Sequence, residues 1–72
     1  MTIEEFKKYI KSIGFKFDES IGIYRNDNYV IVLYNFYYDL YINDLFVDRF
    51  YNSDLTPLRK LDRSYKLKQL LG

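Results

Sequence analysis

The fold is decided by residues 21–51, which read IGIYRNDNYVIVLYNFYYDLYINDLFVDRFY. β-Branched and aromatic residues dominate this stretch and alternate with a period of two, as expected for β-strands. Three short segments interrupt the alternation and are typical of turns: Asn26-Asp27-Asn28, Asn35-Phe36 and Asn43-Asp44. The pattern predicts four antiparallel strands, at about 21–25, 29–34, 37–42 and 45–51, joined in chain order as a β-meander.

A helix is predicted before these strands. Thr2 and Glu5 have the spacing of a capping box, in which each side chain bonds a backbone amide that the helix leaves free. Gly14 is typical of a helix end. The apolar residues between them recur at helical spacing: Ile3, Phe6, Ile10 and Ile13. Phe15 and Phe17 then alternate in a short extended segment that leads to the first strand.

A second helix is predicted after the strands. Thr56 fits an N-cap and Pro57 the first helical position, and the helix is expected to extend to about Leu71. The fold class is therefore α+β, with an N-terminal helix, a four-stranded antiparallel β-meander and a C-terminal helix. The 72 residues are expected to form a single domain, 1–72.

Pairing the strands outward from the three turns assigns each side chain to one face of the sheet. One face is aliphatic and is the expected core: Ile21, Ile23, Ile31, Leu33, Leu40, Ile42, Leu45 and Val47. The other, here called the outer face, is expected to carry Tyr24, Val30, Val32, Tyr34, Tyr37, Asp39, Tyr41, Phe46, Asp48 and Phe50. A solvated sheet surface should alternate to polar residues, so we expect something to cover this outer face.

Two explanations for the outer face stay open at this point. In the first, one helix packs on each face of the sheet, or the register slips at the turn Asn35-Phe36. In the second, the face docks another protein. The register puts Asp39 opposite Asp48, and a lysine or arginine of the partner would relieve their repulsion. The predicted partner-binding residues are Tyr24, Tyr34, Tyr37, Asp39, Tyr41, Phe46 and Asp48.

Catalytic chemistry is poorly represented in this composition. The sequence has no histidine and no cysteine, which removes the commonest general base, the commonest thiol nucleophile and the usual ligands of zinc, copper and haem. Its three glycines stand apart, at positions 14, 22 and 72, so no phosphate-binding loop is present. We therefore expect no enzyme activity, no cofactor and no metal site, although a site built on tyrosine, aspartate or lysine stays open.

Charge divides the chain into three parts. Residues 1–16 carry four lysines and two glutamates, residues 17–56 two arginines and seven acids, and residues 57–72 five bases and one acid. The acidic middle disfavours nucleic acid on the outer face, because phosphates would be repelled. The better candidates for binding DNA or RNA are the bases of the second helix, for which a solvated helix face is the simpler explanation: Arg59, Lys60, Arg63, Lys66 and Lys68.

Location and origin are also predicted from composition. The acidic start of the chain does not resemble a signal peptide and the longest apolar run, Tyr29–Tyr34, is too short to span a membrane, so we expect a cytoplasmic protein without membrane association. Nine tyrosines, six phenylalanines and many isoleucines, lysines and asparagines have AT-rich codons and indicate a low-GC genome.

The function expected from these observations is binding without catalysis. In general character the chain resembles small proteins of phages and mobile elements, many of which inhibit a host protein by occupying its surface. An acidic, tyrosine-rich face would occlude a basic, nucleic-acid-binding surface of such a target. An anti-CRISPR or similar anti-defence inhibitor is the specific hypothesis. The alternatives are a DNA- or RNA-binding regulator that uses the second helix, and a homodimer that packs outer faces together.

Overall fold

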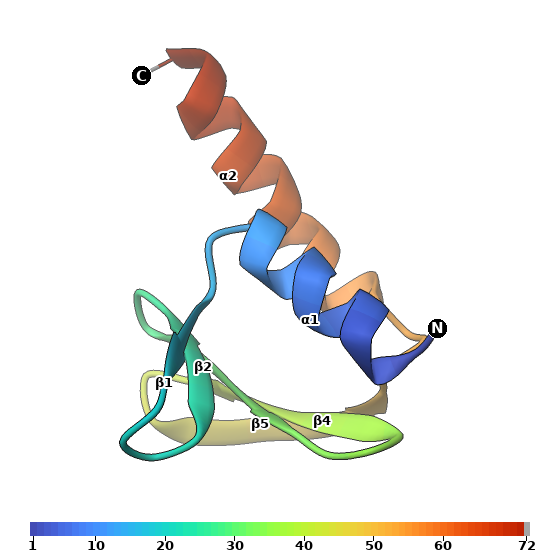
Figure 1. Cartoon of the computed structure of the whole chain (residues 1–72). Coiled ribbons are helices and arrows are strands. Elements are labelled where there is room, and N and C mark those ends of the chain that lie inside the picture. Colours follow the sequence, from blue (N-terminus) through green and yellow to red (C-terminus); the bar gives the residue numbers. More distant parts are fainter. Residues whose placement is uncertain (72) are drawn as a thin grey trace.

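A computed structural model describes residues 1–71 and places both helices on the same face of one antiparallel sheet (Figure 1). The sheet has five strands in the order β1-β2-β3-β4-β5, so the predicted α+β meander is confirmed with one strand more than expected. The elements are α1 (Ile3–Ser12), β1 (Lys16–Asp18), β2 (Ile23–Asn26), β3 (Tyr29–Leu33), β4 (Tyr37–Ile42), β5 (Leu45–Tyr51), the short 3-10 helix η1 (Thr56–Leu58) and α2 (Arg59–Leu71). No helix among these residues is long and apolar enough to cross a membrane.

The helix α1 begins at the predicted capping box. The backbone amide of Glu5 donates to Thr2 Oγ1 at 3.1 Å, and the amide of Thr2 donates to Glu5 Oε1 at 3.1 Å, so two amides without helical partners are satisfied. Phe6 and Ile10 lie on the face toward the sheet and are fully buried. The second helix differs slightly from expectation, because Thr56 lies inside η1 instead of capping α2.

The additional strand is β1, in the segment predicted only as extended. Lys16–Asp18 pairs with β2, with Phe17 opposite Tyr24 and their ring centroids 4.9 Å apart. Phe15 precedes the strand and is buried in the core. Three residues are too few for periodicity to reveal a strand, so only the tertiary pairing identifies it.

The core lies between the helices and the sheet. Its buried members are Phe6, Ile10, Ile13, Phe15, Tyr24, Ile31, Tyr38, Leu40 and Leu58. Ile31 and Leu40 therefore occupy the core as predicted. Ile21, Leu45 and Val47 were wrongly assigned to it, because they lie at the ends and edge of the sheet where no helix covers them, and they are exposed.

The register of the first hairpin differs from the prediction by one residue. Asp27 has a φ of +56°, a conformation that aspartate tolerates, so the turn needs only two residues and Asn26 pairs with Tyr29. A three-residue turn was expected here. The correction places Tyr24 opposite Ile31 in the core, so its predicted position on the outer face is wrong. Its neighbour Ile23 was predicted in the core and instead lies on the outer face.

The second hairpin has the predicted register. Ile31 pairs with Leu40 and Leu33 with Tyr38, so no slip occurs at the Asn35-Phe36 turn. The alternative in which one helix packs on each face is also wrong, since the apolar residues of α1 and η1 join a single core (Figure 1).

The third hairpin follows the prediction at its turn and departs from it beyond. Asn43 and Asp44 both have positive φ, as a type I′ turn requires. Tyr41 still pairs with Phe46, but the next pair is Leu40 with Asp48, so Val47 is an extra residue and forms a β-bulge. Asp48 and Phe50 are consequently not on the outer face with Asp39, and the prediction that Asp39 faces Asp48 is wrong.

Two glycines with positive φ offer a test of how α2 packs against the end of α1. At Gly14 (φ +103°) an added Cβ would lie 3.1 Å from the Tyr65 ring, whereas at Gly22 (φ +68°) it would meet open space. We expect Gly22→Ala to lower the free energy of unfolding by about 1 kcal/mol from backbone strain alone, and Gly14→Ala to lower it by about 2 kcal/mol or more. Urea denaturation followed by circular dichroism measures both. A larger loss for Gly22→Ala would contradict the packing of α2 against the end of α1.

Candidate docking site on the outer sheet face

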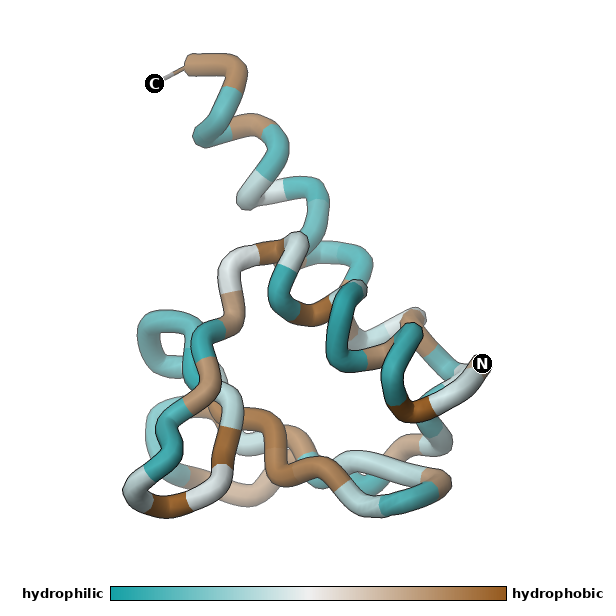
Figure 2. Tube along the Cα trace, viewed as in Figure 1, coloured by the Kyte–Doolittle hydropathy of each residue, from teal (hydrophilic) through white to brown (hydrophobic). Residues whose placement is uncertain are grey.

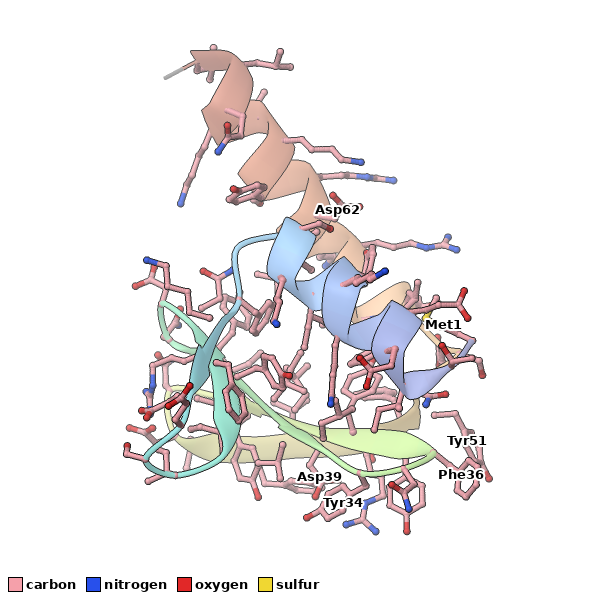
Figure 3. The ribbon with its side chains drawn as sticks, in the orientation of Figure 1. Met1, Tyr34, Phe36, Asp39, Tyr51 and Asp62 are labelled. Atoms are coloured by element: carbon pink, nitrogen blue, oxygen red, sulfur yellow. The ribbon has the colours of Figure 1, made fainter. Side chains whose placement is uncertain are left out.

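The outer face is not covered by any element of residues 1–71. Figure 3 shows Tyr34 and Phe36 on the side of the sheet away from the helices, with Tyr51 beside them at the end of the sheet. Phe36 is 72 % exposed and Tyr51 is 70 % exposed. Phe46 is exposed further along β5. Several large aromatic side chains therefore face solvent on one surface.

An ion pair lies near the centre of this surface. Asp39 of β4 is directly opposite Arg49 of β5, and the bulge at Val47 is what brings them together. Arg49 Nε donates to Asp39 Oδ1 at 2.7 Å and Arg49 Nη2 donates to Asp39 Oδ2 at 3.1 Å. The contact is therefore bidentate, the geometry that makes arginine–carboxylate pairs strong. The Asp39 side chain is 7 % exposed, whereas the Arg49 side chain is 50 % exposed.

Two tyrosine rings also lie close to the guanidinium. Arg49 Cζ lies 5.1 Å from the centroid of the Tyr34 ring and 4.6 Å from that of Tyr37, within the range of cation–π attraction. The two rings are themselves 5.5 Å apart. We call Tyr34, Phe36, Tyr37, Asp39, Arg49 and Tyr51 the Arg49 cluster.

The β3–β4 turn and the end of β5 position this cluster together. Asn52 is buried, its backbone amide donates to the carbonyl of Phe36 at 2.9 Å, and its side-chain amide donates to the carbonyl of Asn35 at 3.2 Å. These bonds fasten the end of β5 to the turn. Tyr37 and Tyr51 are paired across the strands, so Tyr51 stays beside Arg49.

The charges of the pair stabilise each other. Hydrogen bonds from Arg49 lower the pKa of Asp39 below its ordinary value, against the opposing effect of burial. The same hydrogen bonds raise the pKa of Arg49 further above its ordinary value. Both groups are therefore ionised at neutral pH, and the deeper one is neutralised by the more exposed one.

A second aromatic pair extends the surface toward the β4–β5 turn. The rings of Tyr41 and Phe46 meet edge to face at 5.6 Å. Next to them lies an open hollow lined by Ile23, Arg25, Val30, Val32, Tyr41 and Asp44. Its floor is aliphatic and its rim carries one base and one acid, which is the composition of many protein-binding surfaces.

The structure brings together five of the predicted partner-binding residues and separates two. Tyr34, Tyr37, Asp39, Tyr41 and Phe46 occur on the outer face, where their binding of a partner stays a prediction. Tyr24 is buried in the core and Asp48 is opposite Leu40 instead of Asp39.

Three residues of the Arg49 cluster were not predicted. Strict alternation along β5 would turn Arg49 and Tyr51 toward the helices, and nothing in the sequence signals the bulge that reverses them. Phe36 was assigned only to a turn, and a single exposed phenylalanine is not a signal for binding until the structure shows other exposed aromatic residues on the same surface.

The alternative candidates for nucleic-acid binding all lie on α2. Arg59, Lys60, Arg63, Lys66 and Lys68 are exposed. The spacing of the first four puts them on one side of the helix, and Lys66 also pairs with Asp62 at 3.3 Å. The C-terminal half of α2 extends away from the sheet, and Figure 2 shows apolar residues near its end. Leu67, Leu70 and Leu71 are exposed there.

The part of the chain that the structure describes contains no cluster of metal-ligating side chains. Within residues 1–71 no three acidic side chains come close enough together to hold an ion.

The Asp39–Arg49 pair predicts a specific dependence of stability on pH. The pKa of Asp39 is lower in the folded state than its ordinary value of 3.8. The ionised Asp39 therefore contributes fully to the free energy of unfolding above pH 3.8, and this contribution is lost as the pH falls through the folded-state pKa. We expect Asp39→Asn to lower the free energy of unfolding by about 1–3 kcal/mol at neutral pH. The difference from the unmodified protein should shrink steadily below pH 3.8. Denaturant titrations at several pH values measure it.

Asp48→Asn is the matched control for this comparison. Asp48 is exposed on the neighbouring strand β5, and its Oδ1 accepts from the backbone amide of Arg49 at 2.7 Å. An asparagine oxygen can accept the same bond, so this change should cost little. Equal losses from Asp39→Asn and Asp48→Asn would contradict the register described for β4 and β5.

Comparison of the chain with protein-family models, with curated proteins and with solved structures found no match. The function of the chain is therefore inferred from its own residues and their geometry.

Proposed function

We propose that the chain is a non-enzymatic binding module that docks onto another protein through the outer face of its sheet. The observation that carries this proposal is the one-sided packing of the helices, which leaves solvent-exposed side chains on the opposite face: Tyr34, Phe36, Phe46, Arg49 and Tyr51. Contiguous exposed apolar surface on a small domain marks an interaction site. Tyrosine and arginine are also the residues that most often supply binding energy at protein interfaces.

The rigidity of the surface supports the same proposal. The exposed residues stand on β4, β5 and the turn that Asn52 fastens, so they need little ordering when a partner binds. Tyrosine adds to this advantage, because it covers a large area with few rotatable bonds and keeps a polar tip.

Inhibition of a target by occlusion is the finer part of the proposal. A target with a basic surface was expected because Asp39 and Asp48 were placed side by side. That reason no longer holds, since Asp39 is paired with Arg49 and Asp48 lies elsewhere. An origin in a phage or mobile element and an anti-CRISPR role depend on composition alone and stay predictions.

Affinity capture from a low-GC bacterial lysate tests the docking surface. We expect the unmodified protein to capture a protein partner, and this capture should persist after nuclease treatment of the lysate. The variant that combines Phe36→Ser with Tyr51→Ser should no longer capture that partner. Both side chains are mostly exposed, so the double variant should stay folded. Arg63→Glu combined with Lys66→Glu changes only α2 and should capture the same partner.

Two results would contradict the proposal. One is full retention of the partner by the double variant, and the other is loss of the partner by the α2 variant alone. Sedimentation at several protein concentrations accompanies the capture, because a second copy of the chain is also a candidate occupant of the outer face. A dimer that the Phe36 and Tyr51 changes dissociate would identify that copy as the partner.

The exposed bases of α2 favour a second candidate function, binding of DNA or RNA. Arg59, Lys60, Arg63 and Lys66 share a side of the helix that faces solvent, and such a row neutralises phosphates. This hypothesis predicts a salt-sensitive shift of a labelled oligonucleotide on native gels, abolished by Arg63→Glu combined with Lys66→Glu. The Phe36 and Tyr51 double variant should leave that shift unchanged. If the unmodified protein gives no shift at low salt, this function is excluded.

A further inference from the structure

We propose that Arg49 is the anchor of the docking surface and receives a carboxylate from an aspartate or glutamate side chain of the partner protein. This inference rests on the proposed function and assigns the chemistry of the contact at its centre. It reverses the charge expected from the sequence, which called for a basic partner.

Arg49 has hydrogen-bond donors to spare. A guanidinium carries five N–H groups, and Asp39 accepts from Nε and from Nη2. Asp39 is almost completely buried while the Arg49 side chain is half exposed. The part of the ion pair that a partner can reach is therefore the cation, and its free donors are the ones available to an incoming oxygen.

The guanidinium is also held in place before any partner arrives. The Asp39 carboxylate accepts hydrogen bonds from Nε and Nη2 of Arg49. The Tyr34 and Tyr37 ring centroids lie 5.1 Å and 4.6 Å from Arg49 Cζ. A long side chain normally loses rotational freedom when it binds, and that loss opposes affinity. Here most of the loss occurs on folding, so a contact with Arg49 costs less than one with a free surface arginine.

The surroundings favour one negative charge over several. An open hollow next to the ion pair is lined by Tyr37, Arg49, Phe50 and Tyr51. Arg49 is the only charged residue among them, and the buried Asp39 carboxylate already balances its charge. A phosphate group carries close to two negative charges and is usually bound by several cations. A carboxylate carries one, and its two oxygens match the fork of an arginine. The aromatic walls would cover the apolar stem of an acidic side chain.

Titration of labelled protein with two blocked dipeptides tests the assignment. The acidic probe is acetyl-Phe-Asp-amide, and acetyl-Phe-Asn-amide is its neutral match. We expect the acidic probe to shift the side-chain nitrogen resonances of Arg49 and the amides of Tyr37 and Tyr51 in a saturable way. The neutral probe should bind about tenfold more weakly, since it lacks the charge-assisted hydrogen bonds. Equal responses to the two probes, or none at Arg49, would overturn the assignment.

Three further arms define what Arg49 recognises. Arg49→Lys keeps the charge but loses the planar fork, and it should weaken the acidic probe several-fold. Arg25→Lys changes another exposed arginine of the sheet and should have no effect on that probe. Inorganic phosphate should bind more weakly than the acidic dipeptide, and a stronger response to phosphate would overturn the choice of a carboxylate.

The outcome separates this inference from the proposed function. If capture of a protein depends on Phe36 and Tyr51 but the two dipeptides bind alike, the docking surface stands and Arg49 does not anchor an acidic side chain of the partner. If no protein depends on the outer face, the proposed function fails whatever the dipeptides show.

Discussion

The β-bulge at Val47 decides what the outer face of the sheet presents. Without the extra residue, the strands would place Asp39 opposite Asp48, and like charges in facing positions destabilise a sheet by up to about 1 kcal/mol. With it, Asp39 faces Arg49 and forms a bidentate ion pair at 2.7 Å and 3.1 Å. One inserted residue thus replaces a repulsion with an attraction. It also turns Tyr51 outward and Phe50 inward, so both layers of the domain depend on it.

Tyrosine serves both layers in different ways. In the core, Tyr38 is fully buried between Phe6 and Phe50, with ring centroids 4.8 Å and 5.6 Å away, and its hydroxyl donates to the carbonyl of Asp54 at 2.7 Å. Burial raises the pKa of that hydroxyl above its ordinary value, so it stays a donor. A small domain without disulfides needs such large side chains to bury enough area. On the outer face, the same residue type holds Arg49 and remains accessible.

Because both helices pack on one face of the sheet, one face forms the core and the opposite face is the proposed binding surface. The apolar residues of α1 and η1 merge with one face of the sheet, and a contact of 3.5 Å between the Tyr9 hydroxyl and Asp62 joins α1 to α2. The side chains on the opposite face therefore do not contribute to the core. Its aromatic residues are held by the cross-strand pairing, which lets them stay exposed without loosening the fold.

Local patterns in the sequence predict every helix and strand of this protein except β1, whereas the tertiary structure sets β1 and the direction in which several side chains point. Periodicity, the capping box and the positive-φ turn at Asn43-Asp44 are local properties, so both helices, the meander and the Ile31–Leu40 register were predictable. The burial of Tyr24 and the exposure of Arg49 were not. Each depends on a single residue, in a turn one residue shorter than expected or in a bulge within a strand, and one residue inverts a face. No local pattern marks such a change, because it is selected by how the strands pack against α1 and pair with one another.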